Sequence, residues 1–254
     1  MVASPNTTIK SVERSYEIVH ALYSLNGARV HELSDHLDYP PSTVHKHLAT
    51  LENLGYVNTE GDTYDVGIQF LTLGGYARQR KPGYRLAIRL VKQLADEANE
   101  RAQFVVESGG RAIYLHTEGD DQAVMMDRHL GKRRYLHSSA AGKAILAHLS
   151  RDRLEWVLDR WGLPSETERT ITDREELYDE LDRIRSENVA FNDEESIKGL
   201  RAVGVPVLTP QNTVLGSFSV SAPARRLEGD RYRSDLPNLI LGYANELELN
   251  LRNP

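Results

Sequence analysis

The sequence predicts an α+β protein, and three observations lead to that class. Residues 30–66 hold two short amphipathic helical patterns, a turn marked by two prolines, and a hairpin pattern around Gly61. From residue 102 the pattern changes to short runs rich in β-branched and aromatic residues. These runs and the helical segments between them do not alternate as repeated βαβ units would. An antiparallel sheet with helices packed on it is therefore expected in the second part of the chain.

The first predicted helix covers residues 9–25. Its apolar residues recur at helical spacing and are expected to form a buried face: Val12, Tyr16, Val19 and Leu22, with Ile18 and Leu25 beside them. The pair Asn26-Gly27 that follows is typical of a helix C-terminus.

The next two helices are separated by Pro40-Pro41. Residues 30–39 carry apolar side chains at helical spacing, and the prolines end that helix, because proline lacks a backbone donor and disfavours helix in the residue before it. Pro41 suits the first turn of a third helix, over residues 42–54. This helix is expected to bury Val44, Leu48, Leu51 and Leu54. Its other face carries donors that suit phosphates and base edges, namely Ser42, Thr43, His45, Lys46, His47 and Thr50.

Residues 56–59 and 63–66 have the pattern of two strands joined by a turn at Gly61. Two helices, a turn, a recognition helix and a hairpin wing together predict a winged helix-turn-helix, which places one helix end in the major groove of DNA. The alternative is a small helical subdomain with a solvated polar face. The turn prolines, the hydroxyl-rich helix start and the hairpin together favour DNA binding.

A helical linker is predicted over residues 68–101, between an N-terminal domain of residues 1–67 and a C-terminal domain of residues 102–254. Pro82-Gly83 divides the linker into two helical patterns. A pair of helices between domains is a natural connector and often a dimer surface. The alternative is that each helix packs only on its own domain.

The C-terminal domain is expected to combine an antiparallel sheet with helices. Gly109-Gly110 indicates a hairpin between two of its strands. The predicted strands are residues 104–106, 112–115, 124–126, 189–191, 202–208 and 214–220. The predicted helices are residues 139–149, 151–161, one that opens with a capping box from Thr172 to Glu175, and 237–251.

Composition bounds the class of protein. The 254 residues can form two domains with well-buried cores, and the absence of cysteine excludes disulfides, a thiolate nucleophile and cysteine-based zinc sites. No signal peptide or membrane span is indicated, so a soluble, cytoplasmic protein is the expectation.

The charge distribution is unusual for a DNA-binding domain. The net charge is −6, and residues 1–80 hold nine carboxylates against six lysines and arginines. Phosphate attraction would favour the opposite balance. One hypothesis is a cytoplasm of high salt, which binding and stability measured up to molar salt would test. In contrast, residues 67–95 contain Arg78, Arg80, Lys81, Arg85, Arg89 and Lys92 and no carboxylate.

Two segments of the C-terminal domain carry candidate ligand-binding residues. Residues 137–143 place small side chains at a helix start, where free N–H groups and the positive end of the dipole favour an anion. Ser219 and Ser221 lie on one face of a strand and Val220 on the other, which suggests a polar pocket floor. Close packing of a helix start and solvated serines are the alternatives.

The chain resembles the IclR family of bacterial and archaeal transcriptional regulators. The N-terminal residues that carry the resemblance are Ser11-Val12-Glu13-Arg14, Pro41 to Lys46, and Tyr64-x-x-Gly67 with Leu71-x-Leu73-Gly74. In the second domain they are Ser139 to Ala144, Phe191-x-Asp193-Glu194-Glu195, Gly199-Leu200-Arg201 and Ser219 to Pro223. Their order and spacing hold from about Ile9 to Pro223.

The resemblance implies a winged helix-turn-helix, a helical linker and a GAF-like effector domain, assembled as a homodimer or a dimer of dimers on double-stranded operator DNA. It implies a small-molecule effector, an organic acid or a sugar-derived compound, and control of a catabolic pathway. For a regulator, we expect Ser42, Thr43, His45 and Lys46 of the recognition helix to meet base edges, and Thr50 and the wing residues Thr59, Asp62 and Thr63 to lie near phosphates. Arg14 is also expected to bind DNA. The implied effector-binding residues are Ala140, Ala141, Asn192, Leu200, Ala202, Ser219 and Ser221. Asn192 stands where Asp is common in the family, and Ala202 where Cys is common.

An enzyme is the rival class. Ser139 and Lys143 are four apart, so the Ser-x-x-Lys spacing is not met, and the sequence has no Gly-x-Ser-x-Gly, His-Glu-x-x-His or Walker motif. His116, Asp120, Asp121 and His129 could gather a metal, but scattered residues of this kind are usually solvated. No catalytic residue, metal, cofactor or membrane partner is therefore expected. A DNA-bridging protein without an effector is the other alternative, which would bind no metabolite.

Overall fold

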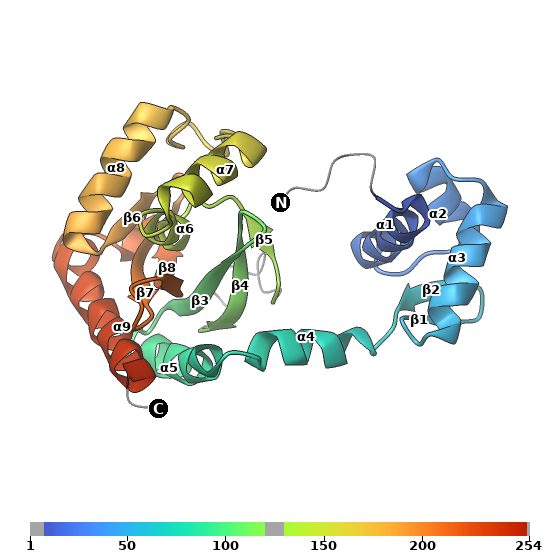
Figure 1. The fold of residues 1–254 in the computed structure, drawn as a ribbon, viewed down its shortest axis with the longest axis horizontal. Helices are drawn as coiled ribbons and strands as arrows, with labels where there is room; N and C mark the ends of the chain where they lie inside the picture. Colours follow the sequence, from blue (N-terminus) through green and yellow to red (C-terminus); the bar gives the residue numbers. More distant parts are fainter. Residues whose placement is uncertain (1–7, 120–129, 253–254) are drawn as a thin grey trace. The chain divides into compact units, whose positions relative to one another are not determined.

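The computed structural model describes residues 8–119 and 130–252, and the chain separates into two compact units, residues 1–78 and 79–254 (Figure 1). The division falls inside the segment that the sequence assigns to a linker over residues 68–101. The strand predicted at residues 124–126 lies outside the described residues. No described helix combines the length and apolar character that crossing a membrane requires.

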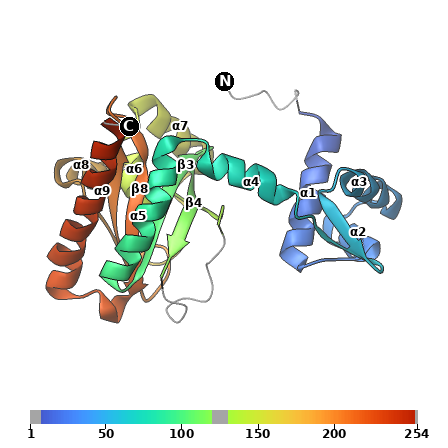
Figure 2. The same ribbon diagram turned by 90° about the horizontal axis from the view of Figure 1, so that it is seen from below.

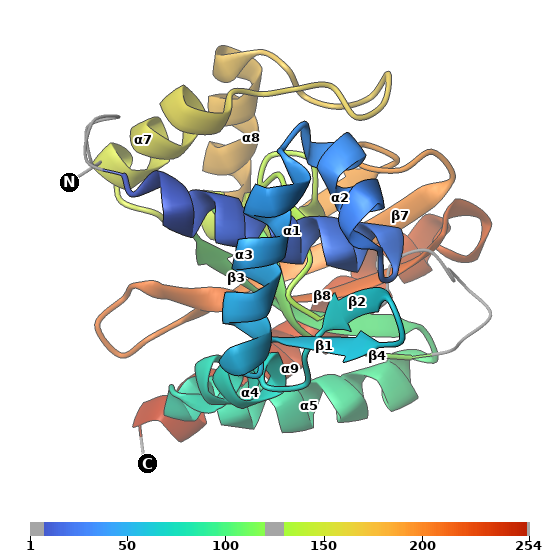
Figure 3. The same ribbon diagram turned by 90° about the vertical axis from the view of Figure 1, so that its right-hand side faces the viewer.

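The N-terminal unit is built on three helices, α1 (Lys10–Leu25), α2 (Val30–Leu37) and α3 (Pro41–Asn53). Figure 3 shows α3 crossing α1 in the foreground. Ile18, Leu22, Leu33, Val44 and Leu48 are fully buried and form the core between the three helices. Pro41 occupies the first turn of α3, as predicted.

The predicted buried face of α1 is wrong in its first half. Val12 and Tyr16 are 50% and 62% exposed, whereas Ile18, Ala21 and Leu22 are buried. The core formed with α2 and α3 therefore takes the C-terminal half of α1, and the apolar side chains of the first half remain outside it.

Leu54 is also exposed, contrary to the prediction, because α3 ends at Asn53 and Leu54 is its C-cap.

The wing is the hairpin of β1 (Val57–Glu60) and β2 (Thr63–Val66), antiparallel and joined at Gly61, whose φ is +66°. A positive φ is the conformation that glycine adopts at no steric cost, so the turn predicted at Gly61 is confirmed. Helix α4 (Phe70–Gln79) follows the wing, and none of its residues is buried within this chain.

In residues 79–119 and 130–252, the C-terminal unit forms a six-stranded antiparallel sheet in the order β5-β4-β3-β8-β7-β6. Their bounds are β3 Arg101–Ser108, β4 Arg111–Glu118, β5 Arg133–Arg134, β6 Ala190–Asp193, β7 Leu200–Leu208 and β8 Val214–Pro223. Every pairing is antiparallel, which confirms the predicted sheet and the hairpin at Gly109-Gly110.

Helices cover both faces of this sheet (Figures 1 and 2). One face is covered by α5 (Pro82–Ala98) and α9 (Leu236–Arg252), which lie side by side over a core that includes Phe104, Phe218 and Val220. The other is covered by α6 (Ala140–Leu146), α7 (Arg151–Trp161) and α8 (Arg174–Glu187). A 3₁₀ turn at Ala224–Arg226 and a π-helical turn at Arg231–Asp235 lead into α9.

Two local details differ from the sequence prediction. Helix α5 buries a full apolar stripe on the sheet, so this helix packs on the C-terminal unit, as the alternative interpretation of the linker holds. The cap of α8 is Asp173 rather than Thr172, because the Asp173 carboxylate accepts hydrogen bonds from the N–H groups of Glu175 and Glu176. A carboxylate one residue later in the chain thus performs the role predicted for the hydroxyl.

Candidate nucleic-acid interface and ligand pocket

Most of the polar face predicted for α3 lies in solvent. Ser42, His45, Lys46 and Thr50 are exposed, and Thr43 is half-buried. The face is available because Val44 and Leu48 point into the core on the opposite side of the helix. This arrangement presents hydroxyls, an imidazole and an ammonium group together, the donors that read base edges and phosphates.

His47 does not belong to that face. It is half-buried, and its Nδ1 lies 2.8 Å from the Ser15 hydroxyl of α1. This contact ties α3 to α1 and orients the exposed residues on either side of His47.

Other predicted DNA-binding residues lie outside α3. Arg14 is exposed on α1, with its guanidinium 5.3 Å from the centre of the Tyr39 ring. Thr63 is half-buried at the start of β2. On the wing, Asp62 forms an ion pair of 3.2 Å with Arg29, which offsets a negative charge that would otherwise repel phosphate.

The ligand pocket follows from the register of the sheet. Asn192 of β6 is opposite Ala202 of β7, which is opposite Ser221 of β8, which is opposite Arg101 of β3. Because directly opposed residues in a sheet share a face, these four side chains form one row facing α6. Gly204, Ser219 and Gln103 form the next row in the same way, and together the rows form the floor of a hollow.

The hollow lies between this floor, the start of α6 and the loop after β6, and its empty space of about 560 Å³ is partly open to solvent. All seven residues that the family resemblance implies for effector binding line it: Ala140, Ala141, Asn192, Leu200, Ala202, Ser219 and Ser221. Gly204 brings α6 close to the sheet, since a Cβ at that position would lie 2.6 Å from the backbone carbon of Ala140. The residues that the resemblance scatters over about 80 positions of sequence thus meet in one place.

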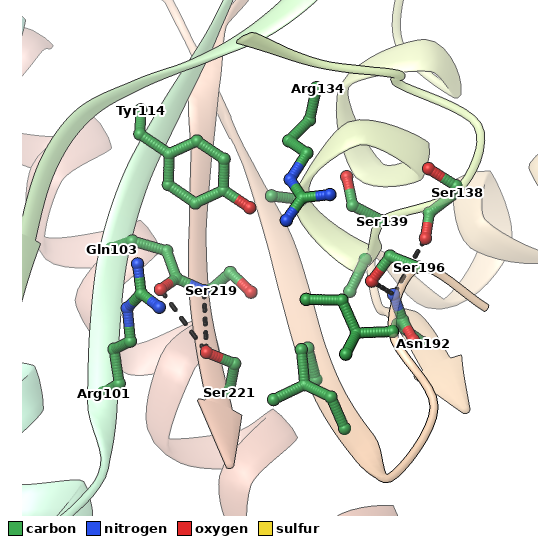
Figure 4. A pocket seen from close by; sticks show the side chains of 15 residues that line it. Arg101, Gln103, Tyr114, Arg134, Ser138, Ser139, Asn192, Ser196, Ser219 and Ser221 are labelled. Atoms are coloured by element: carbon green, nitrogen blue, oxygen red, sulfur yellow. Dashed lines mark hydrogen bonds between the residues drawn. The ribbon is translucent and has the colours of Figure 1, made fainter. Parts of the chain in front are cut away.

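Two arginines give the hollow its charge, and neither was predicted from the sequence. Arg101 and Arg134 line it, with Gln103, Tyr114, Ser138, Ser139, Ser196 and Ile197. Figure 4 shows Arg134 near Tyr114 and Ser139, and Arg101 beside Gln103 and Ser221. Among the described lining residues two carry a positive charge and none carries a carboxylate. The alternation of β3 places Arg101 and Gln103 on one face, a signal that could have been found.

One carboxylate lies close behind this lining. Glu166 is not among the lining residues, but its Oε1 is 3.6 Å from the Arg134 guanidinium and offsets part of that charge.

The two serines of the floor differ in what they offer a ligand. The Ser219 hydroxyl donates to the carbonyl of Val203 at 2.8 Å, so it can receive hydrogen bonds but its proton is used. The Ser221 hydroxyl has two long contacts with the Gln103 side chain: it accepts from Nε2 at 3.3 Å and donates to Oε1 at 3.5 Å. Both serines are buried, so the alternative of a solvated sheet face does not apply.

Asn192 shapes the wall of the hollow. Its Nδ2 donates to the Ser138 carbonyl at 2.8 Å and to the Ser196 hydroxyl at 2.9 Å, and its Oδ1 accepts the Glu195 N–H at 3.0 Å. The side chain is 1% exposed. Its amide is therefore committed to holding the loop after β6 against the start of α6.

A buried ion-pair network stands behind the wall. Lys143 of α6 is 1% exposed, and its Nζ lies 2.8 Å from Glu195 Oε1 and 3.1 Å from Glu180 Oε1. Burial raises the pKa of Glu195, against the opposing effect of Lys143. Burial also acts to raise the pKa of Glu180, but its contacts with Arg183 and Lys143 outweigh it and lower that pKa. The network fixes α6 to the loop that carries Ser196.

Metal ligands are not grouped in the part of the chain that the structure describes. His116 lies in an ion pair with Glu118, with 2.9 Å between Nε2 and Oε1. Asp120, Asp121 and His129, the other residues considered for a metal, lie outside the described residues.

Family models match both units. A model described as the IclR helix-turn-helix domain matches residues 11–61, and one described as the bacterial transcriptional regulator IclR C-terminal domain matches residues 84–248. The sequence is 35% identical to the "Probable HTH-type transcriptional regulator ArcR" of Halobacterium salinarum, over 96% of this chain and 94% of that protein. It is 30% identical to the HTH-type transcriptional regulator KdgR of Escherichia coli, over 88% of this chain and 86% of that one.

The fold is similar to that of solved structures. An IclR homologue from Microbacterium hydrocarbonoxydans, crystallised as a complex with 4-hydroxybenzoate, superposes with a TM-score of 0.80. That alignment covers 96% of this chain and all of the other, at 18% sequence identity. At this identity the likeness concerns the fold.

Proposed function

Because this chain belongs to the IclR family of transcriptional regulators, we propose that it binds operator DNA through α3 and the wing and is controlled by a small acidic metabolite in the hollow of its C-terminal unit. Its homologues are regulators and not enzymes. The chemical class of the metabolite and the type of pathway are also part of the proposal.

One observation supports the metabolite above all: a polar hollow whose described lining carries two arginines and no carboxylate. A carboxylate in such a site would gain charge-assisted hydrogen bonds, which are about twice as strong as neutral ones. The apolar residues Leu200, Ala202 and Ile197 would contact the carbon skeleton. The related structure that holds 4-hydroxybenzoate, an organic acid, agrees with this class of ligand.

The proposed contacts with DNA divide by their position on the fold. Ser42, Thr43, His45 and Lys46 lie at the start of α3, the end of a recognition helix that enters the major groove, so they would meet base edges. Thr50, Arg14 and Thr63 would contact the phosphate backbone. Ligand binding would alter the spacing or the order of two such helices in an assembly, and so the affinity for two half-sites.

We propose a homodimer, or a dimer of such dimers, as the binding form. Helix α4 buries none of its residues within the chain, and Leu71, Leu73 and Tyr76 are each more than half exposed. Apolar residues gathered on one exposed helix usually mark a contact with another protein. Light scattering on the purified protein would give its mass in solution, and a monomer would contradict this part of the proposal.

The central experiment is titration of the protein with a fluorescent duplex of the DNA upstream of its own gene, with and without a panel of carboxylic acids and sugar acids that includes 4-hydroxybenzoate. We expect tight binding to this duplex, weak binding to a scrambled one, and a change in affinity with at least one acid. Absence of any preference over the scrambled duplex, across salt concentrations, would refute the regulator.

Two variants with matched controls locate the two sites. Lys46→Ala should abolish the preference for the operator while the folded state is retained, and Lys198→Ala, another exposed lysine, should leave it unchanged. Ala202→Leu fills the hollow and should abolish the response to the acid but not DNA binding, whereas Ser186→Leu, at an exposed position of α8, should keep both. A protein that binds the operator but no member of the panel would favour the DNA-bridging alternative. The genes beside this one would indicate the pathway, which we propose to be catabolic.

A further inference from the structure

Helix α5 carries a row of positive charges on its solvent side. Lys81, Arg85, Arg89 and Lys92 are exposed and follow one another at intervals of four, four and three residues. At 100° per residue these positions fall within one narrow strip of the helix surface. The apolar stripe that includes Leu90 lies on the opposite side and packs on the sheet. We call these four residues the basic strip.

Within the described residues, no carboxylate pairs with the side chains of the basic strip. The side chains of Arg85, Arg89 and Lys92 form no ion pair or hydrogen bond there, and that of Lys81 contacts the Tyr84 ring, with its Nζ 5.0 Å from the ring centre. Many of the unit's other cations are paired. Several arginines of the C-terminal unit each lie within 4 Å of a carboxylate: Arg151, Arg153, Arg169, Arg174, Arg183, Arg185, Arg201, Arg226 and Arg231.

The strip has defined ends. It begins at the N-cap of α5 and stops before Asp96, which is exposed one turn after Lys92. Eleven residues of helix at about 1.5 Å each give a length of about 16 Å. Phosphates of one DNA strand recur every 3.4 Å or so along the duplex axis, so a strip of this length is matched to a few of them.

The N-terminal unit, which carries the recognition helix, has few positive charges with which to attract DNA phosphates. Residues 1–78 contain nine carboxylates against five basic residues, Lys10, Arg14, Arg29, Lys46 and Arg78. The affinity of proteins for DNA depends largely on cations that displace the counterions of the phosphates. Residues 67–95, which lead into α5 and form most of it, contain six cations and no carboxylate.

We propose that the basic strip of α5 is a second DNA contact, which binds the phosphate backbone of duplex DNA independently of sequence. This inference rests on the proposed function, because that function makes operator DNA the ligand. It adds that the C-terminal unit supplies the electrostatic part of the affinity for DNA. The recognition helix then supplies sequence preference with few charges of its own.

The test removes three charges and measures the dependence of binding on salt. In Arg85→Gln/Arg89→Gln/Lys92→Gln the slope of log affinity against log salt should become shallower by about 2.7 per protomer, at about 0.9 for each phosphate that is no longer neutralised. Equivalently, the loss of affinity between 50 and 200 mM salt should be about 40-fold smaller per bound protomer than in the unmodified protein. Far-ultraviolet circular dichroism at each salt concentration establishes that all proteins compared are folded.

A matched control removes the same charge from scattered sites. Lys198, Arg225 and Arg252 are exposed residues of the same unit. Lys198→Gln/Arg225→Gln/Arg252→Gln should retain the slope of the unmodified protein. Equal slopes for the two triple variants would overturn the proposal. If both slopes matched that of the unmodified protein, the strip would contribute no phosphate contact, and if both became equally shallower, net charge alone would account for the change.

An unrelated duplex separates this proposal from the regulatory one. Salt-dependent binding to any duplex that is lost in the strip variant alone would support the strip even if no operator preference is found. Operator binding that the strip variant retains with an unchanged slope would overturn the strip and leave the regulator standing. Binding to vesicles of anionic lipid that depends on the strip, with DNA binding unaffected, would also overturn it.

Discussion

Replacing Lys143 by methionine tests the buried ion-pair network behind the hollow. Methionine retains much of the volume of the lysine stem but removes the charge. Glu180 would keep its contact with Arg183, at 2.8 Å, whereas Glu195 would lose its ion-pair partner while remaining buried. Removing one partner of a buried pair typically costs about 3–5 kcal/mol, because a buried charge is left without compensation.

The assay is urea denaturation followed by tryptophan fluorescence. Both tryptophans of the chain, Trp156 and Trp161, lie on α7, so the signal reports the C-terminal unit alone. We expect Lys143→Met to reduce the free energy of unfolding by about 3–5 kcal/mol at pH 7. The double variant Lys143→Met/Glu195→Gln should recover part of that loss, since it removes the uncompensated charge.

The pH dependence distinguishes a missing charge from altered packing. Burial already raises the pKa of Glu195, and loss of Lys143 would raise it further. A carboxyl whose pKa is higher in the folded protein is destabilising when ionised, and this cost disappears as pH falls and the group is protonated. The deficit of Lys143→Met should therefore shrink from pH 7 to pH 5. A deficit below about 1 kcal/mol, or one that is the same at both pH values, would refute the reasoning.

Three further predictions concern single residues, each read by the same denaturation assay. Asp173→Ala should lower the free energy of unfolding by about 1 kcal/mol through loss of the α8 cap, and Thr172→Ala should lower it by less than about 0.5 kcal/mol. A larger loss for Thr172→Ala would instead support the capping box predicted from the sequence. Gly204→Ala should destabilise the C-terminal unit by about 1–3 kcal/mol, because its methyl group would meet the backbone of Ala140, and an unchanged midpoint would contradict that close approach. Burial lowers the pKa of His137, so stability should fall as pH drops below about 6.5, and His137→Gln should flatten that fall.

The helices and strands could be predicted because their signals are local. Periodicity, the Pro40-Pro41 turn, Gly61 and the Gly109-Gly110 pair each act within a few residues, and the structure places the corresponding elements within a few residues of the prediction. The errors occur where the burial of a residue depends on segments that are distant in the sequence. Whether Val12 or Ile18 of α1 is buried depends on where α2 and α3 pack, which the periodicity of one helix does not specify.

The residues of the candidate pocket likewise fall into a group that was predicted and a group that was not. The resemblance indicated residues near the start of α6 and on β6 to β8, and these meet in the hollow. Arg101 and Arg134 were missed because their place depends on strand register and on a strand of two residues, β5, that has no periodicity to detect. Residue types alone do not distinguish a lining arginine from a surface arginine that pairs with a carboxylate, such as Arg201 with Asp193.

Asn192 differs from the residue that is common in the family, and this difference changes the chemistry of the hollow. The resemblance indicates Asp at this position, but the Asn192 amide donates to the carbonyl of Ser138, and an ionised carboxylate has no proton to donate there. The backbone N–H of Glu195 occupies the amide oxygen, which fixes the orientation of the group. The amide therefore holds the wall without adding a negative charge to the lining that contains Arg134 and Arg101. The charged groups of the described lining are therefore these two guanidinium groups, and the proposed acidic metabolite would meet no carboxylate at Asn192.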